Sequence, residues 1–114
     1  MANIKIEEIS DKGLVVVAPK GSFVGGDETD DLRNTIKKLS DEGNVKMIID
    51  LGGVNYLNST ALGVLISAHA NYSKREGTIK LCQLNKNLEN LFVITKLSLI
   101  FDSYPTLEEA IASF

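Results

Sequence analysis

Apolar residues recur along the chain with the spacings of amphipathic helices. Over about 27–41, Leu32, Ile36 and Leu39 follow one another at intervals of four and three, which predicts a helix with one buried face. A second helix is expected from Ser59 to about Lys74. Its predicted inner stripe consists of Leu62, Leu65, Ile66 and His69.

Shorter apolar segments predict strands. Residues 4–6 with Ile9, and then 14–18, form an expected hairpin around the turn 11–13, and residues 18–27 leave it as a glycine-rich loop. The apolar run at 45–51, broken only by Lys46, is typical of a strand inside a sheet, and residues 78–84 are expected to form the next strand. Residues 51–58 between strand and helix are expected to form a polar loop. The segment 99–101 is a further short strand candidate.

Two more helices complete the pattern. One is expected over about 86–95, burying Leu88, Leu91 and Phe92, and another begins at Pro105 with apolar residues spaced to pack inward. Strands alternating with helices after an initial hairpin predict an α/β fold. We expect one domain over 1–114, with a mixed sheet of four to five strands and about four helices.

Composition narrows the class of protein. The net charge of −3 and the lack of a basic stripe argue against a nucleic-acid partner. No apolar run approaches the roughly 20 residues that span a bilayer, and the N-terminus lacks the apolar core of a signal peptide. We therefore expect a cytoplasmic protein with no membrane partner. The single cysteine, Cys82, is expected to be a buried core residue.

The segment 48–65 carries the most functional information. Asn58 is a good N-cap, because its side-chain oxygen can accept a hydrogen bond from the first turn of the following helix. Ser59 then occupies the first helical position, near the positive end of the helix dipole, where a phosphate is favoured. An ordinary helix start explains the same residues, so the local pattern alone does not establish modification.

Catalysis is not expected. A nucleophilic serine needs a base within hydrogen-bond reach, and the only histidine, His69, lies about 15 Å further along the same predicted helix. The glycines between Gly21 and Gly26 have neither the phosphate-loop nor the dinucleotide-binding spacing. One histidine and one cysteine cannot form a metal site of the usual kind. We expect no enzymatic activity, no metal and no cofactor.

The chain resembles the STAS-domain anti-sigma factor antagonists over nearly its full length. Asp50-Leu51 resembles the end of the family's strand, and the run from Asn58 to Val64 resembles the family's Asp-Ser-Ser/Thr-Gly-Leu-Gly-Val signature. Residues 80–84, followed by Leu88, Leu91, Phe92 and Leu97, are similar to its next strand and helix. Gly21 and the following helix start occupy the place of its Gly-Glu-Leu-Asp segment.

The resemblance implies a phosphorylation switch. Ser59 corresponds to the phosphorylated serine, and Thr60 is the second candidate. The unphosphorylated protein would bind an anti-sigma factor that is also a serine kinase, and a PP2C-type phosphatase would reverse the modification. The implied partner-binding residues are Asn58, Ser59, Thr60, Gly25, Gly26 and Asp27. The chain itself is expected to be a monomer or a weak dimer.

Three positions differ from the family pattern. Asn58 replaces the usual Asp, Ala61 replaces the usual Gly, and the loop at 22–26 lacks the family's acidic residues. Two alternatives therefore remain. The chain could be a non-phosphorylated STAS module of a larger regulatory scaffold, with Ser59 only a helix start, or a STAS protein that accompanies the transport of a small ligand or lipid.

Overall fold

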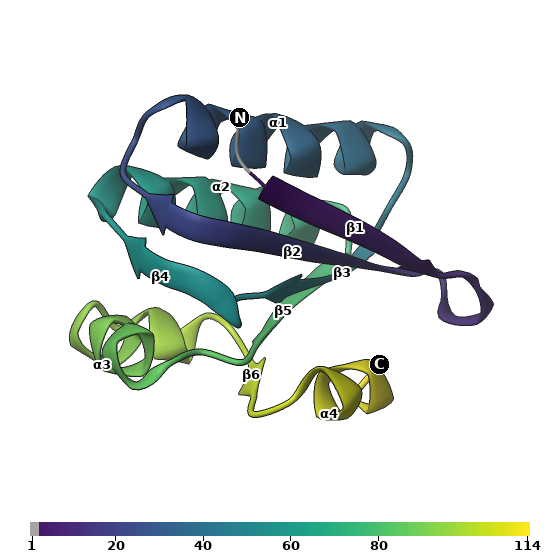
Figure 1. Ribbon diagram of the computed structural model, residues 1–114. Coiled ribbons are helices and arrows are strands. Elements are labelled where there is room, and N and C mark those ends of the chain that lie inside the picture. Colours follow the sequence, from purple (N-terminus) through teal and green to yellow (C-terminus); the bar gives the residue numbers. More distant parts are fainter. Residues whose placement is uncertain (1–2) are drawn as a thin grey trace.

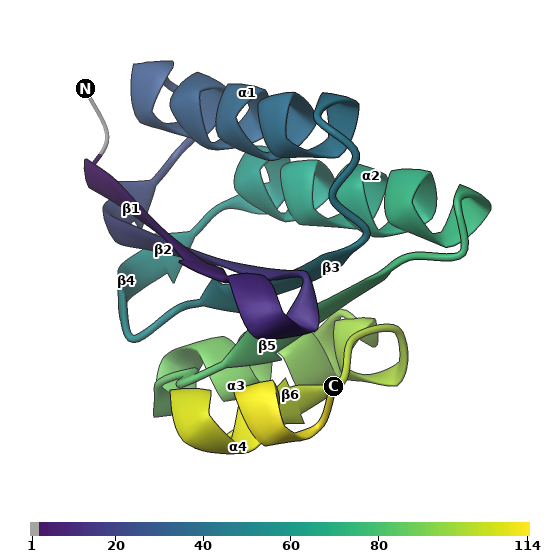
Figure 2. The same cartoon turned by 90° about the vertical axis from the view of Figure 1, so that its right-hand side faces the viewer.

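A mixed β-sheet with helices on both faces forms the centre of the molecule (Figures 1 and 2). The computed structural model describes residues 3–114. Its strands are β1 (Asn3–Ile9), β2 (Leu14–Phe23), β3 (Lys46–Asp50), β4 (Gly53–Leu57), β5 (Thr78–Cys82) and β6 (Ser103–Tyr104). Its α-helices are α1 (Asp27–Asp41), α2 (Ser59–Lys74), α3 (Lys86–Ile94) and α4 (Leu107–Ala112), and its 3-10 turns are η1 (Ser10–Lys12) and η2 (Leu97–Leu99).

The predicted α/β fold class is confirmed, and the sheet has six strands within residues 3–114. The strand order is β1-β2-β3-β5-β6, with β1 antiparallel to β2 and the other pairs parallel. On the side away from β1, β2 pairs with two different strands along its length. Its first half pairs with β3, and its second half, residues 20–23, pairs with β4 after a register shift between Gly21 and Ser22. The sheet is therefore split into a central part and a side arm that leads to α2.

Three sequence-based assignments were wrong. Residues 53–57 form strand β4 instead of a loop, and β2 continues to Phe23 through the segment predicted to be a glycine-rich loop. The two errors have one cause, because these segments are polar and glycine-containing yet pair with each other. Residues 97–99 form the 3-10 turn η2 instead of a strand at 99–101, since Lys96 before it has a positive φ of 63° that starts a tight turn. In residue order, β6 is the last strand of the described residues, and α4 begins at Leu107 behind the N-cap Thr106 instead of at the predicted Pro105.

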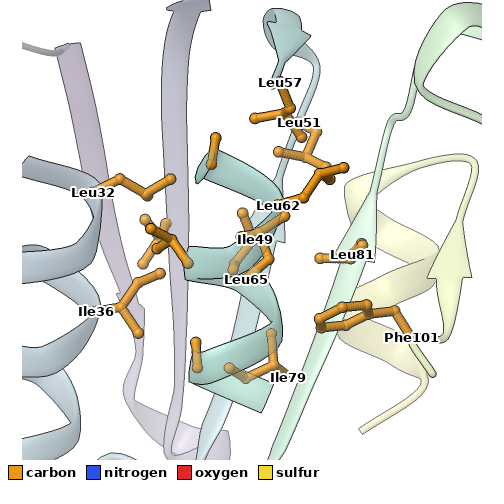
Figure 3. Packing of buried hydrophobic residues seen from close by; sticks show 14 of the residues in the cluster. Leu32, Ile36, Ile49, Leu51, Leu57, Leu62, Leu65, Ile79, Leu81 and Phe101 are labelled. Carbon is orange, nitrogen blue, oxygen red and sulfur yellow. The ribbon is translucent and has the colours of Figure 1, made fainter. Parts of the chain in front are cut away.

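Alternate residues of the inner strands enter two separate cores. Val15, Val17 and Ile49 point into the larger core, which α1, α2 and α3 cover, whereas Val16 and Ile48 point into a smaller core under α4. This two-residue alternation explains why the strand sequences are continuously apolar. Figure 3 shows the larger core, with Leu32 and Ile36 of α1 facing the side chains of α2 and the sheet.

The predicted buried stripe of α1 is confirmed, whereas that of α2 is rotated. Leu62 and Leu65 of α2 are buried, but Ile66 is 41% exposed and His69 is only partly buried. The buried residues on the other side of α2 are Ala61, Val64, Ala68 and Tyr72. Because α2 packs against both the sheet and α1, its buried arc turns toward α1 and leaves Ile66 outside.

Candidate functional site

The start of α2 has the predicted geometry. The backbone of Asn58 is extended, and its Oδ1 accepts a hydrogen bond from the Ala61 N–H at 3.0 Å. Ser59 is therefore the first residue of α2, and both Ser59 and Thr60 are exposed. Within residues 3–114, the Ser59 hydroxyl has no hydrogen-bond partner. Its oxygen is accessible and lies at the positive end of a 16-residue helix.

Two segments distant in sequence leave the sheet side by side at this point. β2 and β4 are parallel, with Phe23 opposite Leu57, and the Asn58 N–H donates to the Phe23 carbonyl at 3.0 Å. Residues 24–27 and 58–60 therefore start from the same edge of the sheet. A β-carbon built on Gly25 would lie 3.4 Å from the β-carbon of Thr60, so the two segments approach closely enough for a side chain at position 25 to touch Thr60. We call residues 25–27 and 58–60 together the Ser59 surface.

Glu28 organises the loop that supplies half of this surface. Its carboxylate accepts hydrogen bonds from the Val24 N–H at 2.8 Å, the Gly26 N–H at 3.0 Å and the Thr29 hydroxyl at 2.6 Å. The Thr29 hydroxyl oxygen in turn accepts from the Gly25 N–H at 2.9 Å. These bonds, that from Thr29 foremost, lower the pKa of Glu28 to about 2. The loop is thus fixed by hydrogen bonds to its main chain.

Sequence reasoning missed this role of Glu28 and Thr29. From the sequence, the acidic residues at 27–31 are explained by their favourable interaction with the positive end of the helix dipole. That explanation is physically sound but incomplete, because an acidic side chain in the first turn can also reach back to free N–H groups before the helix. A glycine pair followed by Glu and Thr at the second and third helical positions was the available signal.

The remaining predicted residues fall on the same surface. Gly26 is the N-cap of α1, and its carbonyl accepts from the N–H groups of Thr29 and Asp30. Asp27 follows as the exposed first helical residue. The structure therefore brings all six predicted partner-binding residues to one edge of the sheet, at the ends of β2 and β4.

Exposed apolar side chains border the Ser59 surface. Val24, which precedes Gly25, is 53% exposed, and Tyr56 on β4 is 52% exposed. Tyr56 also lines a groove of about 360 Å³ with residues of α3, among them Leu91 and Ile94. Neither residue was singled out from the sequence, because isolated apolar residues in a segment predicted to be a loop carry no period.

The groups considered for other chemistry are placed elsewhere. His69 packs edge-on against Phe101, with ring centres 5.1 Å apart. Cys82 is buried, as predicted, and burial together with the neighbouring Asp50 carboxylate raises the pKa of its thiol to about 12. No three or more His, Cys, Asp or Glu side chains among residues 3–114 are grouped so that they could hold a metal ion. No α-helix in that range is long and apolar enough to cross a membrane.

Comparison with known proteins gives a consistent result. The family model of the STAS domain matches residues 5–110. The anti-sigma-B factor antagonist of Bacillus subtilis is 37% identical over 71 residues, which cover 62% of this chain and 64% of that protein.

Two solved structures share the fold. An anti-sigma factor antagonist from Mycobacterium paratuberculosis superposes with a TM-score of 0.83 at 23% identity, covering 99% of this chain and 93% of that chain. The Bacillus cell fate determinant SpoIIAA in its phosphorylated form has a TM-score of 0.77 at 17% identity, covering 97% and 98%.

Proposed function

The chain belongs to the STAS domain family, and on that premise we propose that it is an anti-sigma factor antagonist switched by phosphorylation of Ser59. In its unphosphorylated form it binds an anti-sigma factor that is also a serine kinase, and this binding releases the sigma factor. Phosphorylation by the bound kinase ends the complex, and a PP2C-type phosphatase restores it. The chain is a cytoplasmic binding protein and a kinase substrate, with no catalytic group of its own.

The observation that carries this proposal is the position of Ser59. Its hydroxyl is exposed and has no hydrogen-bond partner among residues 3–114, and it stands at the first position of α2, where the loop 24–27 and the N-terminus of α2 meet. A kinase can reach such a hydroxyl without unfolding the chain. Two relatives point the same way, since the Bacillus subtilis protein is named an anti-sigma-B factor antagonist and SpoIIAA has been solved in a phosphorylated form. Thr60 is the second candidate, but its side chain packs beside Gly25.

The energetics of the phosphate differ between the free protein and the complex. A phosphoserine carries about −1.5 to −2 charges, and the N-terminus of α2 favours such a charge by about 0.3–1 kcal/mol. In a docked interface the same group must lose water, and a mispaired charge there costs about 2–5 kcal/mol. That cost corresponds to a loss of affinity of roughly 30-fold to several thousand-fold. Phosphorylation therefore leaves the fold intact and breaks the complex.

The composition of the surroundings supports this direction of the switch. The charged side chains of the loop and the first turn of α1, namely Asp27, Glu28 and Asp30, are all acidic, and the Glu28 carboxylate already accepts hydrogen bonds from its own loop. The bordering Val24 and Tyr56 offer apolar contact. A partner that covers apolar side chains and an uncharged Ser59 gains nothing from a phosphate placed among them.

A phosphorylation experiment tests the modification. The purified chain and two variants, Ser59→Ala and Thr60→Ala, are incubated with ATP and a lysate of the native organism, and the phosphates are mapped by peptide mass spectrometry. We expect one phosphate on Ser59 in the wild type and in Thr60→Ala, and none in Ser59→Ala. A phosphate that persists in Ser59→Ala and disappears in Thr60→Ala would move the switch to Thr60.

A binding experiment tests the consequence. The kinase retained by immobilised wild-type chain is purified, and its affinity is compared for wild type, Ser59→Ala and Ser59→Asp. We expect Ser59→Ala to bind like the wild type and Ser59→Asp to bind at least about 30-fold more weakly. Equal affinity for Ser59→Asp would refute the switch.

The scaffold module is the alternative, and Asn58 is the residue that favours it. Where the family has Asp, this chain keeps the N-cap but has no charge beside the serine. A chain that is never phosphorylated by an active kinase, and that elutes within a large stable assembly, would support this alternative.

A further inference from the structure

Strand β1 leaves one edge of the sheet open. It pairs with β2 along all seven of its residues, from Asn3 opposite Lys20 to Ile9 opposite Leu14. Within residues 3–114 no other strand pairs with β1, and Figure 1 shows it at the margin of the sheet. An edge strand has outward-pointing N–H and C=O groups that can pair with a further strand.

The side chains of β1 fall on two distinguishable faces. Ile4 packs against the larger core and Ile9 against the smaller one, so even-numbered positions face the side of α1 and α2 and odd-numbered positions face the side of α4. Ile6 is 48% exposed on the first of these faces. Lys5 and Glu7 are exposed on the second.

We propose that β1 pairs antiparallel with β1 of a second copy of this chain, on a two-fold axis through Ile6. Residues directly opposite each other in an antiparallel pair point to the same face of the sheet. A two-fold axis normal to the sheet must therefore place one residue opposite its own copy in the other chain. On an axis through Ile6, Lys5 of each copy lies opposite Glu7 of the other. The exposed Ile6 side chains then meet each other on the opposite face.

The neighbouring registers are worse for a physical reason. An axis through Lys5 places the two Lys5 side chains opposite each other, and an axis through Glu7 or Glu8 does the same with two carboxylates. Like charges directly opposite destabilise a strand pair, whereas opposite charges stabilise it. The order Lys-Ile-Glu at 5–7 is therefore self-complementary in one register only.

The proposed dimer is weak and reversible. β1 is about 24 Å long at about 3.4 Å per residue, so one strand pair buries less surface than the roughly 1,200 Å² at the lower end of stable interfaces. We expect a dissociation constant in the micromolar range or above. The Ser59 surface is formed by the ends of β2 and β4 and does not include β1, so the dimer is independent of the proposed switch.

Charge exchange tests the register. Sedimentation equilibrium is measured for wild type, Lys5→Glu, Glu7→Lys and Glu8→Lys, from about 10 µM to about 1 mM, the range in which small interfaces associate. We expect the wild type to dimerise, and we expect Lys5→Glu and Glu7→Lys to associate at least about tenfold more weakly. The pair of positions 5 and 7 occurs twice in the symmetric dimer, and each of these variants places like charges opposite each other in both pairs. Glu8→Lys is the matched control. It changes the net charge as Glu7→Lys does, but position 8 lies opposite Ile4.

Mixing provides the decisive observation. Position 5 and position 7 are both acidic in Lys5→Glu and both basic in Glu7→Lys, so an equimolar mixture of the two should associate at least as well as the wild type. Wild-type protein that stays monomeric at about 1 mM would overturn the proposal. So would a dimer that Glu7→Lys and Glu8→Lys weaken equally, or a mixture that associates no better than either variant alone.

Discussion

Gly25 in the loop after β2 lies beside Thr60 in the first turn of α2, at a distance that a single added carbon would close. A β-carbon added to Gly25 would meet the Thr60 side chain at 3.4–3.5 Å, and the Gly25 backbone has a φ of +88° that other residues rarely adopt. This close approach brings the two halves of the Ser59 surface together. The shape of that surface therefore depends on the absence of a side chain at position 25.

We expect Gly25→Ala to deform the Ser59 surface. The positive φ alone costs about 1–2 kcal/mol for a residue with a β-carbon. Gly43→Ala is the matched control, because Gly43 has a φ of +98° and open space around it, away from the Ser59 surface. Both variants should lose similar stability in urea, but only Gly25→Ala should shift the Thr60 amide resonance and weaken kinase binding. Equal effects of both on the Thr60 amide would contradict the close approach.

The cap of α2 gives a second prediction. Asn58→Ala removes the bond to the Ala61 N–H and should lower the free energy of unfolding by about 0.5–2 kcal/mol. Asn58→Asp keeps the cap and adds a negative charge at the helix N-terminus, which should raise stability by about 0.3–1 kcal/mol over the wild type. Urea titrations monitored by circular dichroism measure both values. A neutral effect of Asn58→Ala would show that solvent replaces the cap at no cost.

The lowered pKa of Glu28 predicts that the loop it holds is sensitive to acid. Its pKa is lowered from 4.5 to about 2 in the folded chain, so the folded state favours the ionised carboxylate. The stabilisation is complete above the unfolded pKa near 4.5 and is lost as the pH falls toward 2. The stability difference between wild type and Glu28→Gln should therefore shrink over that interval.

Thr29→Val identifies the source of this shift. The Thr29 hydroxyl is the largest cause of the lowered pKa, so its removal should move the titration midpoint of the Glu28 carboxyl upward. The measurement is a pH titration of the Glu28 side-chain carbon by NMR in both proteins. Coincident titration curves would show that Thr29 does not control the ionisation of Glu28.

Cys82 should be inert in the native protein. It is buried, and the pKa of its thiol is raised to about 12 by desolvation and the Asp50 carboxylate, so almost no thiolate forms near pH 8. We expect labelling by an aromatic disulfide reagent to be at least about a hundredfold slower than in urea-unfolded protein. Because the chain has one cysteine, the signal reports this position alone. Equally fast labelling of folded and unfolded protein would contradict the burial of the thiol.

The parts of the fold that were predicted correctly are those with a clear hydrophobic period. The buried face of α1 around Leu32 and the cap at Asn58 depend on local chemistry that a sequence displays directly, whereas the buried face of α2 was predicted only in part because α1 also covers it. β4 and the second half of β2 were missed because they stabilise each other across the chain, which no local pattern records. The same holds for Glu28, because it binds main-chain N–H groups, which every residue except proline has and which therefore leave no mark in the sequence.

The residues of the candidate site were predicted from the sequence, but the residues that hold and border them were not. The resemblance to a family identified the residues of the Ser59 surface, and the structure brings them to one edge. Their role in binding and modification stays a prediction. The bordering Val24 and Tyr56 lacked any periodic signal, so only the folded arrangement shows that they lie beside it.

The way Glu28 holds its loop has a consequence for divergence among paralogues. Every hydrogen bond that the side chains of Glu28 and Thr29 make to the segment 24–26 comes from a main-chain N–H of that segment, so the loop conformation does not depend on the side chain at Val24. Val24 and the exposed Asp27 are thus free to change without loosening the loop. If the Ser59 surface binds a partner as proposed, related chains could therefore differ in partner choice through these two positions, while the loop conformation and the serine beside them stay the same.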